Sequence, residues 1–141
     1  MQTGQYYDIN YCADSRAAAA QDQRHTMIFI YTHKNEKYKQ IEVVCRRINE
    51  PCKTIGPADL GKTVGMIISG SSGQHASVPP FYAMPEVIIF SGLSSGKMDE
   101  FLSGYRAAGI TPIAIKASVT PFNLNWTLYA LIEHIKKEIK A

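Results

Sequence analysis

The segment whose spacing most resembles a chemical site is Gly56–Thr63, GPADLGKT, which satisfies the pattern G-x-x-x-x-G-K-[ST]. In a phosphate loop, backbone N–H groups surround the phosphates, the lysine binds them and the hydroxyl holds Mg²⁺. Pro57 lacks one of those N–H groups, and it begins a stretch typical of a helix start, which would place Lys62 inside a helix. We therefore expect a helical turn here. Phosphate or nucleotide binding by Gly61, Lys62 and Thr63 is the alternative.

A second candidate is the turn Ser91–Gly96, SGLSSG, which follows the most apolar strand-like run. Small residues leave backbone N–H groups accessible, and a helix N-terminus attracts anions. The turn does not match G-x-G-x-x-G, so it carries no dinucleotide fingerprint. It is either a ligand-binding turn or a tight connection in which Ser94 or Ser95 caps the next helix.

Lys116 closes the last apolar run, where its ammonium group would either bind a ligand or order the Ser91 turn by donating to carbonyl groups. No acidic pair follows the first strand, which excludes the phosphoacceptor site of a receiver domain. His33 has no carboxylate placed to orient it, and the chain has no G-x-S-x-G motif. We expect no catalytic residues and favour a protein that is not an enzyme.

The charge and the cysteine content limit the classes of partner that we expect for this protein. Lys+Arg is 15 and Asp+Glu is 12, and a dispersed net charge of +3 argues against nucleic acid. The three cysteines and four histidines lack zinc spacing, so we expect no metal. The odd number of cysteines with no signal peptide suggests reduced thiols, and we expect no cofactor. Apolar runs are too short to cross a membrane, and no export signal is visible. These features predict a cytoplasmic protein without a membrane partner.

Hydrophobic periodicity predicts strands alternating with helices. The first half of the expected order is a strand at Met27–Tyr31, a helix capped by Asn35 and carrying Tyr38 to Ile48, a weak strand at Cys52–Ile55, and a helix opened by Pro57 and running through Ile68. The second half is a strand at Val87–Phe90, a helix carrying Met98 to Tyr105 and ended by Gly109, a strand at Ile113–Ile115, and a last helix capped by Asn123 or Asn125. Residues 69–82 form a long loop. Residues 1–26 form an N-terminal extension.

This β-α-β-α-β-α-β-α order indicates a single three-layer α/β domain over residues 27–141. We expect a mainly parallel four-stranded sheet in the order 2-1-3-4. Ligands of such sheets bind outside the carboxyl ends of strands where the order reverses. The expected ligand-binding residues are therefore Thr32, His33, Ser91, Gly92, Ser94, Ser95, Lys116 and Thr120.

Three stretches of the chain resemble a known family. They are Asp59–Gly65, DLGKTVG; Glu86–Gly92, EVIIFSG, followed by YRAAGI at Tyr105–Ile110; and Ile115–Pro121, IKASVTP, followed by Asn123, Trp126 and Thr127. Together they make residues 27–141 similar to bacterial proteins of the domain of unknown function family 3783. The resemblance implies a compact α/β domain of bacterial origin and no particular reaction.

Two functions of different class remain. The first is a non-enzymatic domain that binds a small ligand or a protein, including a second copy of itself, with an exposed apolar contact patch at Pro79, Pro80, Phe81 and Tyr82. The second is nucleotide or phosphate binding through the Lys62 turn or the Ser91–Gly96 turn.

Overall fold

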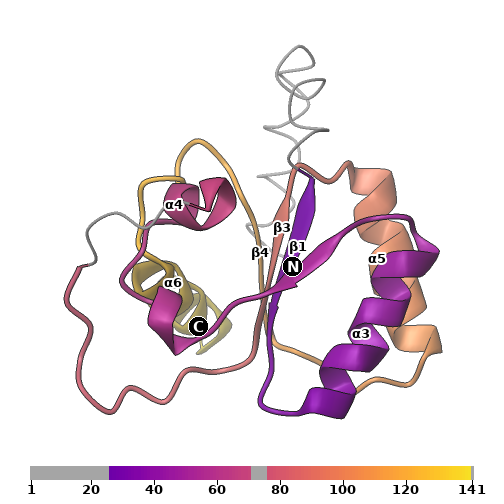
Figure 1. Cartoon of the computed structure of the whole chain (residues 1–141), viewed down its shortest axis with the longest axis horizontal. Helices are drawn as coiled ribbons and strands as arrows, with labels where there is room; N and C mark the ends of the chain where they lie inside the picture. Colours follow the sequence, from indigo (N-terminus) through magenta and orange to yellow (C-terminus); the bar gives the residue numbers. More distant parts are fainter. Residues whose placement is uncertain (1–25, 71–75, 141) are drawn as a thin grey trace.

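Four short strands form one sheet with helices on both faces (Figure 1). The computed structural model describes residues 26–70 and 76–140. The strands are β1 (Met27–Tyr31), β2 (Cys52–Thr54), β3 (Val87–Ser91) and β4 (Ile115–Ser118). The helices are α3 (Asn35–Arg47), α4 (Val64–Ser69), α5 (Ser95–Ala107) and α6 (Leu128–Lys140), with a 3₁₀ turn, η2 (Pro57–Asp59).

The strand order is β2-β1-β3-β4, which confirms the predicted α/β domain and its order. β1 pairs with β2 in parallel, and β3 pairs with β4 in parallel. The central pair, β1 and β3, is antiparallel: Met27 lies opposite Ser91 and Tyr31 lies opposite Val87. The strands therefore end at two different edges of the sheet, β1 and β2 at one and β3 and β4 at the other. We call the edge where β1 ends the Thr32 edge, and the edge where β3 and β4 end the Ser91 edge.

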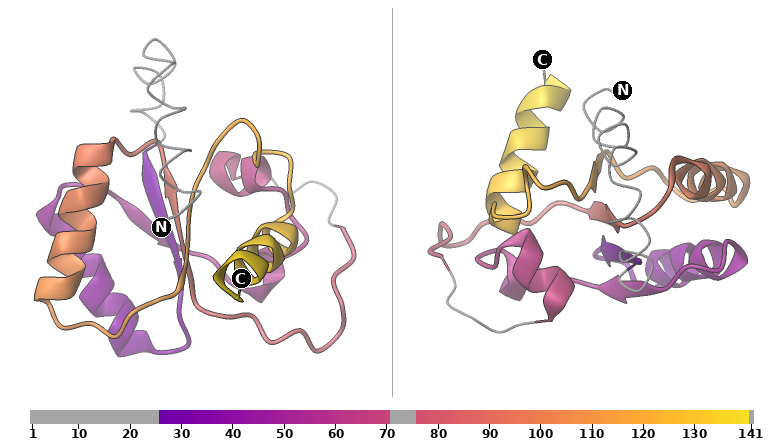
Figure 2. Two further views of the ribbon diagram at one scale, coloured as in Figure 1. Left: turned by 180° about the vertical axis from the view of Figure 1, so that it is seen from behind. Right: turned by 90° about the horizontal axis from the view of Figure 1, so that it is seen from above.

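Helices α3 and α5 cover one face of the sheet, and α4 and α6 cover the other (Figures 1 and 2). Because the central strands are buried on both faces, they consist of nearly continuous apolar residues. Along β3, Ile88 and Phe90 pack beneath α3 and α5, whereas Val87 and Ile89 pack toward α4 and α6.

Several element boundaries differ from expectation. The predicted helix from Pro57 to Ile68 is split into η2 and a separate short α4, because the hydroxyl of Thr63 accepts from Met66 N and starts a new helix. The last strand is Ile115–Ser118, so Lys116 lies inside it rather than at its end. Helix α6 is capped by Thr127, whose hydroxyl accepts from Ala130 N, and not by Asn123 or Asn125.

Other local expectations are confirmed. Ser94 is the N-cap of α5, and Gly109 follows its C-cap with φ +70°, the left-handed conformation that favours glycine. The expectation that Asn35 caps α3 is wrong: Asn35 is the first residue of the helix, and the N-cap is Lys34, which makes no side-chain capping bond. The expected extension falls outside the described residues except for Thr26, and so does part of the expected loop at residues 69–82.

The described chain consists of two similar units in tandem, each with the order strand, helix, strand, turn, helix. Unit 1 runs from β1 to α4 and unit 2 from β3 to α6. Both first strands have five residues and both first helices have 13. Both second helices begin after a threonine, Thr63 or Thr127, whose hydroxyl caps them.

A pseudo-twofold axis relates the units, because residues in equivalent positions contact one another. Phe29 pairs with Ile89 in the sheet, and Thr63 pairs with Thr127 in an isolated antiparallel bridge. The hydrogen bonds around that bridge are reciprocal. Val64 N donates to Trp126 O at 2.8 Å and Leu128 N to Lys62 O at 2.9 Å; Gly65 N donates to Leu124 O at 2.9 Å and Tyr129 N to Leu60 O at 3.0 Å.

Candidate functional site

The predicted ligand-binding residues lie at two opposite edges of the sheet. Thr32 and His33 follow β1 at the Thr32 edge, and the ammonium of Lys116 is directed toward it, donating to Ile113 O at 2.7 Å. The remaining residues lie at the Ser91 edge: Ser91, Gly92, Ser94, Ser95 and Thr120. The single cleft expected from all eight residues is therefore not formed, and that prediction is wrong.

The physical reason is the connection between β2 and β3. A parallel β3 would require the chain to cross back over the full length of the sheet. Helix α4 has six residues, a length of about 9 Å, and residues 76–86, the described part of the connection before β3, contain no further helix or strand. The chain therefore re-enters the sheet at the edge that it left, and β3 starts beside the end of β1.

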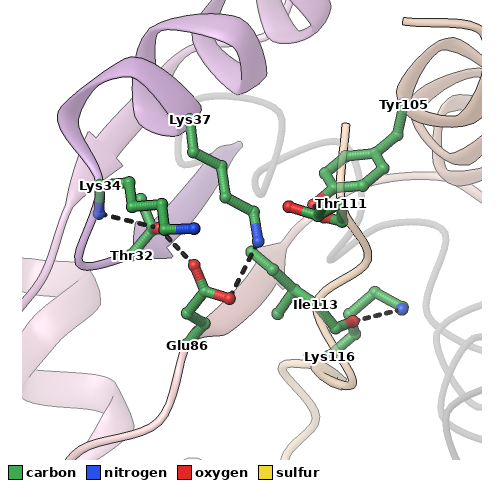
Figure 3. A network of polar contacts seen from close by, with 8 residues as sticks. All are labelled: Thr32, Lys34, Lys37, Glu86, Tyr105, Thr111, Ile113 and Lys116. Atoms are coloured by element: carbon green, nitrogen blue, oxygen red, sulfur yellow. Dashed lines mark hydrogen bonds and ion pairs between the residues drawn. The ribbon is translucent and has the colours of Figure 1, made fainter. Parts of the chain in front are cut away.

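At the Thr32 edge, three polar side chains from different elements converge. The Glu86 carboxylate, one residue before β3, accepts hydrogen bonds from the Thr32 hydroxyl and from Lys37 Nζ, the latter at 2.9 Å (Figure 3). The side chain of Lys37, in the first turns of α3, is 7% exposed, and that of Glu86 is 24% exposed. This is a largely buried ion pair in which both charges have a partner.

The direction of the Glu86 pKa shift agrees with an ion pair in which both charges are compensated. Burial acts to raise the pKa of Glu86, but hydrogen bonds from Thr32 and Lys37, with the charges of Lys37 and His33, outweigh it and hold that pKa below its ordinary value. Burial raises the pKa of Tyr105 to about 12, with a smaller contribution from the Glu86 charge, and the Tyr105 hydroxyl donates to Thr111 O at 2.6 Å. Burial lowers the pKa of Lys116.

These contacts favour a structural role for the cluster. An ionised carboxylate that already accepts from Thr32 and Lys37 is a poor general base, because its ionised form is strongly stabilised. Glu86 was not among the predicted site residues. A signal was present, however: Lys37 occupies the buried stripe of its helix with Ile41 and Val44, and a lysine there requires an acidic partner.

At the Ser91 edge, the polar side chains also serve the fold. The amide of Asn123 accepts from Thr120 N at 2.9 Å and donates to Ser118 O at 3.0 Å, which holds the turn after β4. The Ser94 hydroxyl accepts from Lys97 N and caps α5. These bonds favour the structural interpretation of Ser94 and of Thr120.

The phosphate-loop alternative is not supported by the geometry of its turn. Lys62 Nζ lies 2.9 Å from Asp59 Oδ1 in an ion pair, and the Thr63 hydroxyl caps α4. The N–H groups of Asp59, Leu60 and Lys62 donate to carbonyl groups within the turn, so they do not surround an anion.

Unit 2 repeats the same turn, which explains the motif. Its sequence Thr120–Leu128, TPFNLNWTL, aligns with Gly56–Val64, GPADLGKTV. In unit 1 the side chain of Asp59 accepts from Gly56 N at 3.0 Å, and in unit 2 the side chain of Asn123 accepts from Thr120 N at 2.9 Å. Since the turn forms in unit 2 without the glycine and lysine of the pattern, its shape does not depend on phosphate chemistry.

Within residues 26–70 and 76–140, no group of three or more His, Cys, Asp or Glu side chains could hold a metal ion. No helix among these residues is long and apolar enough to cross a membrane.

The most exposed large apolar side chain described is Phe81, in the segment that leads to β3. Its side chain is fully exposed, and its φ of 61° places it in the left-handed region that non-glycine residues rarely adopt. The flanking residues Pro79 and Pro80 are exposed as well. The next residue, Tyr82, is packed against α6.

The C-terminal part of the chain matches a known family model. Residues 86–141 match the family model for a domain of unknown function (DUF3783). The match confirms the predicted resemblance over these residues, whereas residues 27–85 lie outside it. It begins one residue before β3 and includes α6, so the DUF3783 match corresponds to unit 2. Neither a curated protein nor a solved structure shows significant similarity to the chain.

Proposed function

We propose that the chain is a non-enzymatic protein-interaction module whose contact surface is the segment Pro79–Tyr82, the interaction patch, and whose partner is a second copy of the chain. The observation that carries the proposal is the outward position of Phe81, which is 102% exposed at a φ of 61°. Exposing a phenyl ring to water forgoes the free energy that its burial would contribute. An aromatic ring held in solvent is a typical interface anchor.

The patch is held in place by contacts on its C-terminal side. The Tyr82 hydroxyl donates to Glu133 Oε2 at 2.5 Å, and its ring packs edge-on against Tyr129 with centroids 4.8 Å apart. Lys136 Nζ lies 5.4 Å from the centre of the Tyr82 ring. Two residues later, Met84 is buried. Phe81 is therefore presented from an anchored segment, which lowers the entropy lost on binding.

The other functions considered have less support. A single cleft for a small ligand would need Thr32 and Ser91 at the same edge of the sheet, but they lie at opposite edges. Phosphate binding would need free N–H groups around Lys62, but those of Asp59, Leu60 and Lys62 donate to carbonyl groups within the turn. A bacterial origin and a cytoplasmic location are part of the proposal. The bacterial origin rests on the family resemblance, and the cytoplasmic location rests on the odd number of cysteines, which suggests reduced thiols.

Size-exclusion chromatography with light scattering over a concentration series tests the proposal. We expect the mass of the unaltered chain to rise with concentration toward that of a dimer, and Phe81→Ser to remain monomeric. Phe122→Ser is the matched control, since Phe122 is a second exposed aromatic residue, 69% exposed, in the turn before α6. It should associate like the unaltered chain.

Two results would count against the proposal. A strictly monomeric unaltered chain removes self-association, and association of Phe81→Ser equal to that of the unaltered chain removes the role of the patch. Thermal shift with ATP, GTP and sugar phosphates tests the alternative. A ligand at one hundred times its Kd should add about 2.7 kcal/mol of stability.

A further inference from the structure

Two cysteines of unit 1 are brought together by the way α3 ends. Asn49 has a φ of 63°, and its N–H donates to Arg46 O at 3.0 Å; Glu50 N donates to Cys45 O at 3.0 Å. These two bonds are those of a Schellman motif, which reverses the chain at the end of a helix. Cys52, the first residue of β2, consequently packs against the core cluster that contains Cys45.

The two thiols differ in their access to solvent. Cys45 is buried, with 1% of its surface exposed, whereas Cys52 is partly exposed. The Tyr38 hydroxyl lies 3.8 Å from Cys52 Sγ. Burial raises the pKa of the Cys45 thiol, and the charge of Cys52 and a hydrogen bond to it raise that pKa further. Cys45 is therefore a protected thiol next to an accessible one.

The fold itself does not require cysteines at these positions. By the pseudo-twofold axis, Cys45 in α3 corresponds to Tyr105 in α5, and Cys52 in β2 corresponds to Lys116 in β4. Unit 2 forms the same helix and strand pair without a thiol at either place. The dithiol is thus a property of unit 1 and not of the repeated architecture.

We propose that Cys45 and Cys52 form an intramolecular disulfide when the chain meets a low-molecular-weight disulfide, which makes this end of α3 a redox-sensitive modification site. The inference does not depend on the interaction patch. It concerns the opposite face of the sheet, where α3 packs.

The reaction takes place in two exchange steps. The Cys52 thiolate attacks one sulfur of the small disulfide, whose S–S bond breaks, and the departing thiolate takes up a proton. The Cys45 sulfur, after losing its proton to water, then attacks the Cys52 sulfur of the mixed disulfide and releases the second small thiol. Together the two protein thiols lose two electrons and two protons, and the small disulfide is reduced to two thiols.

The test treats the reduced full chain with glutathione disulfide, quenches free thiols with iodoacetamide and maps the tryptic peptides by mass spectrometry. Cleavage at Arg46 and Arg47 separates the two cysteines, so a disulfide links the peptides Gln40–Arg46 and Ile48–Lys53. We expect this linked pair, with a loss of two hydrogen atoms from the intact mass. A stable glutathione adduct on Cys52 without the linked pair would overturn the proposal.

Single variants assign the two roles. Cys45→Ala should accumulate the glutathione adduct on Cys52, because the second step is lost. Cys52→Ala should leave Cys45 unmodified, because that thiol is buried. Equal modification of Cys45 in Cys52→Ala and in the unaltered chain would contradict the proposed order. Cys12→Ser removes the third thiol and should leave the linked pair unchanged; disappearance of the pair in this variant would refute the assignment.

Discussion

At the scale of single residues, the ion pair of Lys37 and Glu86 is the feature with the largest energetic consequence. Lys37 is almost fully buried on the inner face of α3, and Glu86 is the carboxylate that compensates its charge. Removing one partner of such a pair leaves a buried charge without compensation, which costs far more than losing an exposed pair. The pair therefore fixes the beginning of α3 to the start of β3, two segments far apart in the sequence.

The first prediction concerns this pair. Glu86→Gln should lower the free energy of unfolding at neutral pH by about 1–3 kcal/mol, since the amide keeps a hydrogen bond but not the charge. Urea unfolding followed by circular dichroism measures the change. Glu42→Gln is the matched control, because Glu42 and Arg46 form an exposed pair at 3.7 Å, and it should change stability by less than about 1 kcal/mol.

The same pair predicts a pH dependence. The pKa of Glu86 lies below its ordinary value of 4.5 in the folded chain, so the folded state binds its proton less readily than the unfolded state. The stabilisation is complete above that value and is lost as pH falls through the lowered pKa. The difference between the unaltered chain and Glu86→Gln should therefore shrink below pH 4.5. A constant difference down to pH 2 would show that the carboxylate charge is not responsible.

At the scale of elements, the close contact of α3 and α5 decides the packing on their face of the sheet. Val44 and Gly104 occupy equivalent positions on the two helices, and they meet near the pseudo-twofold axis. A Cβ atom added at Gly104 would lie 3.2 Å from Val44 Cγ1, closer than ordinary van der Waals contact. Glycine at this position thus allows the two helices to approach, although it lowers helix propensity.

The second prediction follows from that contact. Gly104→Ala should destabilise the chain, because the crowding against buried Val44 exceeds the gain in helix propensity of about 1 kcal/mol. In a Val44→Ala background the crowding disappears, and the same substitution should become neutral or stabilising. A double-mutant cycle by urea unfolding measures this coupling. Additive effects of the two substitutions would show that the helices are not in limiting contact.

At the scale of the whole molecule, the two units share one core and cannot be separated without breaking the centre of the sheet. Five residue pairs join β1 to β3. The bridge between Thr63 and Thr127, with its reciprocal hydrogen bonds, joins the units a second time. Each unit alone would expose one side of the central strand pair and half of that bridge, so a stable fold requires both units.

The third prediction tests this cooperativity. The single tryptophan, Trp126, reports on unit 2, and far-ultraviolet circular dichroism reports on both units. Unfolding curves from the two probes should coincide. Ile41 is fully buried in unit 1. Ile41→Ala should therefore lower the free energy of unfolding that each probe measures by the same amount, about 2–5 kcal/mol. A Trp126 transition that does not move with Ile41→Ala would show that the units unfold independently.

The sequence alone predicted the elements and their order well, because hydrophobic periodicity and capping are local properties. The runs Met27–Tyr31 and Val87–Phe90 are apolar throughout, as strands buried on both faces require. The internal repeat was also readable, since GPADLGKTV and TPFNLNWTL share a proline, a side-chain acceptor, a leucine and a threonine at the same spacing. The similarity of the two segments indicates a structural turn at Lys62 from the sequence alone.

Only the tertiary structure decided the direction of β3 and the partner of Lys37. The direction depends on where the chain re-enters the sheet after α4, and no residue pattern near β3 encodes that point. The ion pair joins residues on elements that are adjacent only because β1 and β3 are antiparallel. For the same reason, Thr32 and Ser91 were expected in one cleft but lie at opposite edges: side-chain types are local, whereas strand direction is set by the path of the whole chain.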